Sequence, residues 1–443
     1  MNRKLTIAAI VIASAAIGIG IAVTDFGNKS VPNGSENFPI PNGGDTTNGS
    51  FAVLPDSDPP SNSIPNTRVE KVVAGLASPT SMAFLDSDDI LILEKNSGRV
   101  RYVLDGKLQE NSIHDVAINN NNERGLLGIA VSRGTDSMKA KTIFLYLTEE
   151  VGRGEVRNRV YRFNWSAEAG MSNRTLVLDL PGTPGPNHDG GKLAVGPDGM
   201  LYAVIGDLNR NGMLQNYQEG DKPDDTSVIL KVDSSGNGVS PQLSDKNASI
   251  DANLSRYYAY GIRNSFGIDF DPETGNLWDT ENGPSDYDEI NIVRPGFNSG
   301  WEKIMGPIGR TGIDVAELVM FNGSQYSDPE FSWRSARGIT DIEFFNSTTL
   351  GETYANNIFV GDINNGNLYF FALNEQRDGL SFDTTRSAGL ADLVADDDEV
   401  SIVTVGTGFK GITDIETGPD GFLYVLSYSG SLFRIVPDCQ PPP

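Results

Sequence analysis

The stretch LAVGPDGMLYAVIGD, from Leu193 to Asp207, decides the fold. It consists of a short apolar run, a turn built from Gly, Pro and Asp, and a second apolar run, which is typical of a β-hairpin. The pattern returns clearly as IDFDPETGNLWDTEN (Ile268 to Asn282) and as DIETGPDGFLYVLSYSGSLFRI (Asp414 to Ile435). Weaker copies lie at 81–104, 126–150 and 339–373, so the chain carries this theme six times.

The copies are regularly spaced. The hexapeptide GITDIE begins at Gly338 and at Gly411, an offset of 411 − 338 = 73 residues, and comparable starts at Gly191 and Asn264 give 73 and 74. A unit of this length with about four strands fits one blade of a propeller. Helical periodicity is nearly absent, which argues against α/β barrels and helical solenoids. The sequence therefore predicts an all-β fold, a six-bladed β-propeller. A pair of β-sandwiches is the main alternative, but it does not explain the regular offset.

Composition excludes several classes of protein. The 443 residues carry 59 acidic and 34 basic side chains, a formal charge of 34 − 59 = −25, so the chain repels nucleic acid and nucleic acid is not an expected partner. With 38% hydrophobic residues it can bury a large core. The one cysteine, Cys439, excludes a disulfide framework, and two histidines exclude a His-rich zinc site.

The N-terminal part predicts export. Arg3 and Lys4 precede 19 uncharged residues, 5–23, which fit either a cleaved signal peptide or a transmembrane anchor. Residues 24–66 are rich in Pro, Asn and Gly and predict a flexible linker, leaving 67–443 for the propeller. Nine Asn-x-Ser/Thr triplets are consistent with a glycoprotein. We expect an extracellular or cell-surface protein, secreted or held to the membrane by its N-terminal segment.

The innermost strands of a propeller converge on one channel, so residues at the entry to each repeat share a cup. The third repeat opens with GPNHDGGKLAVGPDG, which places Asn187 and His188 there. A histidine titrates near neutrality and is a candidate base, and Asp207, after the next strand, is a candidate partner that orients it. The alternatives are a histidine that only bonds a turn and a turn-capping aspartate. His114, in SIHDVA, has no such context and is interpreted as structural.

Two further segments add candidates. YGIRNSFGIDF brings Arg263 and Asn264 to the cup, where an arginine could neutralise an oxyanion or clamp a carboxylate, or could be purely structural. The turn TENGPSDYDEIN is rich in hard oxygen donors: carbonyls beside Pro284, with the carboxylates of 286, 288 or 289, could bind calcium, although the spacing is not that of an EF-hand. Glu123, in ERGLLGIAV, fits either a site or a salt bridge with Arg124 at the edge of the core.

Taken together, NHDGGKLAVGPDGMLYAVIGD, YGIRNSFGIDFDPETGNLWDTENGPSDYDEIN and GFNSGW resemble the glucose/sorbosone dehydrogenase family, which comprises six-bladed, PQQ-dependent sugar dehydrogenases. The resemblance runs from Val69 to Pro437. It implies oxidation of the C1 hydroxyl of an aldose or oligosaccharide, with electrons passed to an external acceptor. It also implies that His188 is the base, that Asp207 orients it, and that Glu123 lines the sugar side.

The resemblance implies two cofactors, PQQ and a calcium ion that polarises a quinone carbonyl. The calcium would be held by the carbonyl oxygens of Gly283 and Pro284, and Glu289 matches a residue that holds a structural calcium in some members. The predicted catalytic residues are His188, Asp207 and Arg263, and the predicted cofactor contacts are Asn187, Arg263, Asn264, Asn282 and Lys410.

The sequence departs from the soluble glucose dehydrogenases where they bind the carboxylates of PQQ. Asn364 stands in place of a fifth-blade Lys, and Gly411 and Thr413 stand in place of two sixth-blade Arg, with only Lys410 nearby. The alternative function is therefore a non-catalytic propeller that binds a glycan or a surface protein. A calcium-dependent hydrolase such as a lactonase is a third hypothesis, and the lack of a His pair argues against it.

Overall fold

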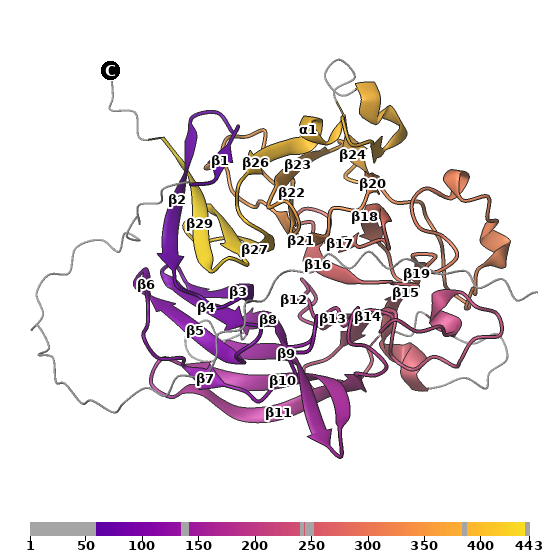
Figure 1. Cartoon of the computed structure of the whole chain (residues 1–443), viewed down its shortest axis with the longest axis horizontal. Helices are drawn as coiled ribbons and strands as arrows, with labels where there is room; N and C mark the ends of the chain where they lie inside the picture. Colours follow the sequence, from indigo (N-terminus) through magenta and orange to yellow (C-terminus); the bar gives the residue numbers. More distant parts are fainter. Residues whose placement is uncertain (1–58, 134–140, 240–242, 244–251, 383–387, 439–443) are drawn as a thin grey trace, which may run out of the picture. The chain divides into compact units, whose positions relative to one another are not determined.

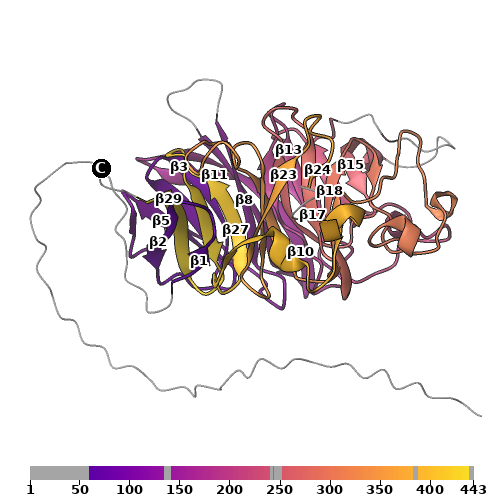
Figure 2. The ribbon, with the colours of Figure 1, turned by 90° about the horizontal axis from the view of Figure 1, so that it is seen from above.

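The computed structural model describes residues 59–133, 141–239, 243, 252–382 and 388–438. These residues form six β-sheets, each a blade of a propeller (Figure 1). The innermost strands β3, β8, β12, β16, β21 and β27 contact one another in that order, and β27 contacts β3, so the ring is closed. Figure 2 shows the same sheets from the side, after a turn of 90°. The all-β, six-bladed architecture predicted from the repeats is confirmed.

The first two blades follow the chain directly, and the third also takes in a short strand from beyond the first three strands of blade 4. Blade 1 contains β3 (Pro79–Asp86), β4 (Asp89–Glu94), β5 (Arg99–Leu104), β6 (Lys107–Leu108) and β7 (His114–Asp115). Blade 2 contains β8 (Leu126–Arg133), β9 (Lys141–Gly152), β10 (Glu155–Ser166) and β11 (Gly170–Pro181). Blade 3 contains β12 (Leu193–Val195), β13 (Leu201–Ile205), β14 (Val228–Val232), β15 (Tyr257–Tyr260) and β19 (Phe297–Asn298).

The last three blades borrow strands from distant parts of the chain. Blade 4 contains β16 (Ser265–Phe270), β17 (Leu277–Glu281), β18 (Asp286–Val293), β20 (Phe331–Ser335) and β25 (Val394–Ala395). Blade 5 contains β21 (Ile339–Phe344), β22 (Ile358–Asp362), β23 (Leu368–Leu373), β24 (Leu380–Ser381), β26 (Thr404–Thr407) and β1 (Ser61–Asn62). Blade 6 contains β27 (Ile412–Thr417), β28 (Leu423–Ser427), β29 (Ser431–Pro437) and β2 (Thr67–Ala74).

Helices are few and short in the described residues. They are the α-helix α1 (Val400–Val403) and the 3-10 helices η1 (Met213–Gln215), η2 (Ala252–Arg256), η3 (Ile308–Arg310), η4 (Val315–Glu317) and η5 (Ala388–Asp392). No helix in this part of the chain is long and apolar enough to cross a membrane. The segment 5–23, predicted as a signal peptide or anchor, and Cys439 lie outside the described residues.

The ring closes by pairing the two ends of the described chain. β2 lies antiparallel to β29, with Val69 opposite Ile435, and it supplies the outermost strand of the blade formed by the last three strands. Ser61 also pairs with Thr407 of blade 5, although 24–66 is predicted to be linker. Backbone pairing orders this short polar segment, and its composition carries no periodicity that could have indicated a strand.

The repeated turn residues are explained by backbone geometry. In GPDG of blade 3 the N–H of Gly196 donates to the carbonyl of Met200 at 2.9 Å, and Gly199 has φ +75°, a conformation that favours glycine. Blade 6 repeats this turn, with Gly418 bonded to Phe422 at 2.9 Å and Gly421 at φ +82°. The turn thus sets the register of each hairpin.

An aspartate on the innermost strand links each of three consecutive blades to the next. Asp269 accepts from the N–H of Phe344 at 2.8 Å, and Asp341, in the first GITDIE, accepts from that of Ile415 at 2.8 Å. Asp414, in the second GITDIE, accepts from the N–H of Met82 at 2.5 Å. The hexapeptide therefore repeats because the same buried bond joins successive blades.

The hydrophobic core is divided among the blade interfaces. Six clusters of buried residues lie between successive blades, including one between blades 6 and 1 that contains Leu426 and Ile92. Each blade is therefore apolar on both faces, which is why its strands read as nearly continuous apolar runs.

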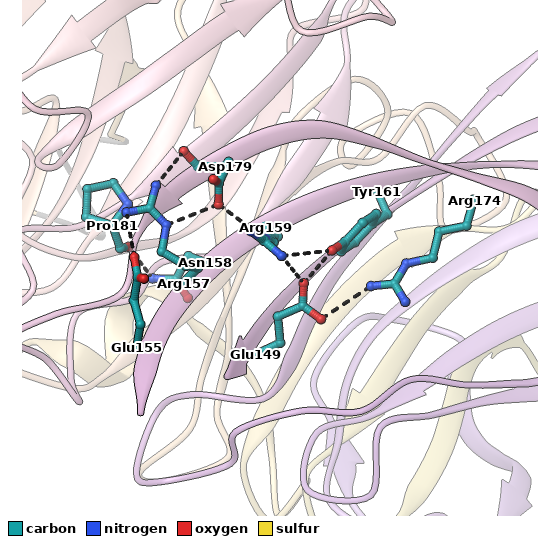
Figure 3. Close-up of polar contacts among 9 residues, drawn as sticks. All are labelled: Glu149, Glu155, Arg157, Asn158, Arg159, Tyr161, Arg174, Asp179 and Pro181. Atoms are coloured by element: carbon teal, nitrogen blue, oxygen red, sulfur yellow. Dashed lines mark hydrogen bonds and ion pairs between the residues drawn. The ribbon is translucent and has the colours of Figure 1, made fainter. Parts of the chain in front are cut away.

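Blade 2 also carries a network of charged side chains on its outer strands (Figure 3). Arg159 donates to Asp179 at 2.8 Å and to Glu149 at 2.9 Å. Asp179 also accepts from Arg157 at 3.1 Å, and Glu149 from Arg174 at 3.3 Å. We call these residues the blade 2 network, and every carboxylate in it has a cationic partner.

Candidate active site

A cavity of about 320 Å³ lies where the innermost strands converge. All six blades or the loops that join them contribute to its lining: Thr80, Ser81, Lys95, Asn122, Glu123, Leu127, Gly190, Lys192, Phe266, Thr340, Ile363, Thr413 and Tyr428. The cup expected from the repeats is thus present. Of the predicted site residues, Glu123 lines this cavity directly.

His188 lies beside this cavity, in the loop between β11 and β12. Its Nδ1 is 2.5 Å from Oδ1 of Asp207, and its side chain is 12% exposed. The loop approaches the end of β13 closely because position 206 is glycine: a Cβ there would lie 2.5 Å from the carbonyl oxygens of both His188 and Arg263. With Nδ1 engaged by a carboxylate, Nε2 is the ring nitrogen that can accept a proton.

Asp207 is held by donors from four directions. Besides His188, it accepts from the N–H of Asn209 at 2.8 Å, from Nε2 of Gln215 at 2.7 Å and from the indole Nε1 of Trp301 at 2.8 Å. These bonds fix the orientation of the carboxylate. The sequence predicted the pairing of Asp207 with His188, but neither Gln215 nor Trp301.

Glu123 connects the histidine loop to blade 4. Its Oε2 accepts from the N–H of His188 at 2.7 Å and from Nδ2 of Asn264 at 3.1 Å. The neighbouring Arg124 donates to the carbonyl of Pro184 at 3.3 Å and lies 3.9 Å from buried Asp189. Glu123 therefore belongs to the site, and Arg124 anchors the loop that carries His188.

Arg263 and Asn264 reach the same region from the start of blade 4. The guanidinium of Arg263 donates to the carbonyl of Asn282 at 2.8 Å and stacks on the Trp301 ring, 5.2 Å from its centroid. Its Nε and the Oδ1 of Asn264 are buried and have no hydrogen-bond partner among the described residues. Asn282 is itself buried and donates to the carbonyl of Ile339 at 2.7 Å. Asn187 is half-buried, and none of the described residues bonds its side chain.

The Gly283–Pro284 turn leaves its carbonyls open. In the described part of the chain, no hydrogen bond ends on the carbonyl oxygen of either residue. Asp288, suggested as a calcium ligand, instead accepts from the backbone N–H groups of Gly283 at 2.9 Å and of Arg337 at 2.6 Å, so it closes the turn. Asp286 is exposed.

Glu289 belongs to a buried carboxylate pair at the base of this turn. It stands opposite Glu281 across β17 and β18, and both are buried. Burial, with the charge of Glu281, raises the pKa of Glu289 well above its usual value. Among the described residues, no group of three or more His, Cys, Asp or Glu side chains is arranged to hold a metal ion. Glu289 as a structural-calcium ligand therefore stays a prediction.

The residues at the cation positions of blades 5 and 6 are neutral: Asn364, Gly411 and Thr413. Thr413 lines the cavity, as does Ile363, the neighbour of Asn364, whereas Lys410 is exposed and does not. Arg337, the other nearby cation, pairs with the exposed carboxylate of Asp397. Lys410 as a cofactor contact therefore stays a prediction.

His114 behaves as the sequence analysis expected of a structural histidine. It packs edge-on against Phe163, 4.9 Å between ring centroids, and burial lowers its pKa.

The sequence did not indicate three charged groups that lie near the site: Lys95, Lys192 and Asp189. Burial raises the pKa of Asp189 to about 6. Asp189 follows His188 directly, so the NHDGG motif contained a signal for it.

The model of the glucose/sorbosone dehydrogenase family matches residues 76–434. The chain belongs to this family. The match spans all six blades, from the residues just before β3 to β29, so family membership and the propeller describe the same part of the chain.

Individual relatives are similar at low identity. The aldose sugar dehydrogenase YliI of Escherichia coli strain K12 is 25% identical over 376 residues, 83% of this chain and 92% of that protein. Quinoprotein glucose dehydrogenase B of Acinetobacter calcoaceticus is 29% identical over 162 residues, 33% of this chain and 32% of that protein. The PQQ-bound aldose sugar dehydrogenase of Streptomyces coelicolor superposes with a TM-score of 0.62 at 21% identity, covering 84% of this chain and 98% of that one.

Proposed function

We propose that this protein is a PQQ-dependent oxidoreductase that oxidises the C1 hydroxyl of aldose sugars, with His188 as general base. The observation that carries the proposal is the His188–Asp207 pair, 2.5 Å apart and bonded through Glu123 to the lining of the central cavity. The family and the printed names of the relatives, a sugar dehydrogenase and a quinoprotein, support the same reaction.

The residues present fit the implied cofactors. A planar, anionic quinone needs buried donors, and Arg263 Nε is a buried donor with unused hydrogen-bonding capacity. Calcium prefers oxygen ligands, and the carbonyls of Gly283 and Pro284 accept no hydrogen bond in the described residues. When bound, PQQ with calcium would supply an electrophilic quinone that accepts two electrons.

The chain's own residues handle the proton. With Nδ1 directed at Asp207, His188 offers Nε2 to the C1 hydroxyl and holds the proton there. The Asp207 carboxylate stabilises the resulting imidazolium and keeps the ring in one orientation. Glu123 holds the backbone of His188 at 2.7 Å, so the base stays at a fixed position relative to the cavity.

The two histidines provide a matched test. Calcium and PQQ would be added to the purified whole chain, and dye reduction followed with a panel of aldoses for the wild type, His188→Ala and His114→Ala. We expect turnover in the wild type and in His114→Ala, and a loss of about 10³-fold or more in His188→Ala. Turnover unaffected by His188→Ala would remove the base assignment, and absence of PQQ binding would remove the cofactor.

The second candidate, a propeller that binds a glycan or surface protein without redox chemistry, is favoured by one observation: the neutral residues at the cation positions of blades 5 and 6. It predicts no PQQ binding by calorimetry and no dye reduction. It also predicts retention on an immobilised glycan or partner that His188→Ala does not alter.

We further propose that the protein is exported and acts at the cell surface. The support is the charge pattern of residues 1–23, together with the exposure of four Asn residues of Asn-x-Ser/Thr triplets, Asn164, Asn173, Asn322 and Asn346. Fractionation of cells that express the whole chain tests this, and recovery in the cytoplasm alone would contradict it.

A further inference from the structure

Lys95 is a buried cation that faces the central cavity. It follows β4, its side chain lines the cavity, and the residue is 9% exposed. Its ammonium donates to the carbonyl of Asn122 at 2.5 Å and to Oδ1 of Asn96 at 3.2 Å. Both acceptors are neutral, and no carboxylate of the described residues lies within 4.0 Å of it. An ammonium has three N–H groups, so one remains without an acceptor.

Lys192, the other lysine that lines the cavity, is neutralised by carboxylates in contact with it. Its Nζ lies 2.8 Å from Asp341 and 2.5 Å from Asp414, the two carboxylates that also link blades 5, 6 and 1. Their charges hold the pKa of Lys192 well above its usual value despite burial. Lys192 is therefore part of the structure of the ring and has no charge left to offer a ligand.

Lys95 differs in its electrostatics. Burial lowers its pKa, and the more distant carboxylates of Glu123 and Asp189 act in the opposite direction. A buried charge without a contacting counter-ion is costly, and an anionic group that enters the cavity would relieve that cost.

We propose that Lys95 pairs with a carboxylate group of the molecule that fills the cavity, and that this molecule is the anionic cofactor. The inference rests on the proposed function and deepens it: blade 1 supplies a cation that blades 5 and 6 lack. Neither Lys410, which is exposed, nor Arg337, which pairs with Asp397, lines the cavity. A carboxylated sugar is the other source of the same chemistry, and the experiment separates the two.

The test is calorimetric titration of the calcium-loaded whole chain with PQQ. Lys95→Gln removes the charge and keeps a donor for Asn122, Lys95→Arg keeps the charge, and Lys107→Gln is the control, an exposed lysine of the same blade. We expect Lys95→Gln to weaken binding about 10- to 100-fold, as the loss of a charge-assisted bond does. Lys95→Arg should stay within about fivefold of the wild type and Lys107→Gln within about twofold. The binding constant of Lys95→Gln should also depend less on salt.

The outcomes distinguish the two levels of the proposal. PQQ binding by Lys95→Gln as tight as by Lys107→Gln overturns the role of Lys95 and leaves the proposed function intact. If the wild type does not bind PQQ, the proposed function is overturned. Titration with glucuronate then decides whether Lys95 pairs with the carboxylate of a sugar acid instead. If glucuronate binds and Lys95→Gln abolishes that binding, Lys95 still pairs with a carboxylate, and a sugar acid is its source. If neither ligand binds, the role of Lys95 is overturned as well. Melting curves of each variant establish that it is folded.

Discussion

The blade 2 network and the residues around the central cavity use the same charged groups in opposite ways. On blade 2, Arg159 lies between two carboxylates and each carboxylate has further partners at the partly exposed surface (Figure 3). Beside the cavity, Lys95 is buried, Arg263 is half-buried with a buried Nε, and both keep N–H groups without acceptors.

This difference distinguishes charged groups that stabilise the fold from charged groups that are available to bind a ligand. Exposed ion pairs each contribute little, and a network is useful mainly because its members hold one another in place. A buried donor without a partner costs free energy in the empty protein, so it persists where a ligand completes it. We therefore expect substitutions at the cavity to change activity and binding, and substitutions in the blade 2 network to change only stability.

The largest expected effect is on Asp207. Asp207→Asn leaves the size of the side chain unchanged but removes the charge that stabilises protonated His188, so kcat should fall by about 10³-fold or more. Steady-state dye reduction measures it. The matched change in the blade 2 network, Asp179→Asn, should leave kcat within about twofold of the wild type. Equal losses in the two variants would abolish the distinction drawn here.

Asp189, in the loop that carries His188, tests whether burial of a carboxylate makes the free energy of unfolding depend on pH. Its pKa is raised to about 6, mainly by burial, from a usual value of 3.8. The folded state therefore holds this proton more tightly than the unfolded state does, and the free energy of unfolding should fall as pH rises from about 4 to 6, by up to about 3 kcal/mol.

Asp189→Asn keeps the acceptor for Asn158 and should remove this part of the pH dependence. Urea denaturation of both proteins between pH 4 and 7 measures it, and parallel pH curves for variant and wild type would contradict the expectation.

Trp301 gives a smaller, more selective effect. Trp301→Phe keeps an aromatic ring against Arg263 but removes the indole N–H bond to Asp207. We expect kcat to fall about tenfold, the order of one hydrogen bond. Trp165→Phe, on blade 2, controls for loss of a tryptophan, and an equal kcat in the two variants would make Trp301 purely structural.

The smallest effect is expected in the blade 2 network. Glu149→Gln removes a carboxylate that pairs with Arg159 and Arg174 and should lower the free energy of unfolding by about 0.5–1 kcal/mol, with sugar oxidation unchanged. Chemical denaturation at low and high salt measures it. A loss of oxidation in this variant would mean that blade 2 influences the site.

The fold could be predicted because its signals are local. Gly199 and Gly421 mark hairpin turns by their own backbone conformation, and the regular offset of GITDIE reflects a bond that each blade makes to the next. His188 and Asp207 could be paired because each flanks a strand of one hairpin. Lys95 and Trp301 could not, because Lys95 follows a strand of blade 1 and Trp301 follows β19, which is distant in sequence from β13 and joins blade 3 only in the folded structure. Asp288 was a plausible calcium ligand by composition, but backbone N–H groups use its oxygens.

The pairing of β2 with β29 also bears on how the protein is made. Val69 leaves the ribosome early and must wait for Ile435 before its strand has a partner, so five blades exist before the ring does. Contacts so distant in sequence form slowly, and until they form, the apolar faces of blades 1 and 6 have nothing to cover them. The assembling chain is therefore most prone to aggregation in this interval. A factor that shields those faces during synthesis should raise the yield of folded protein more than any change at the catalytic residues.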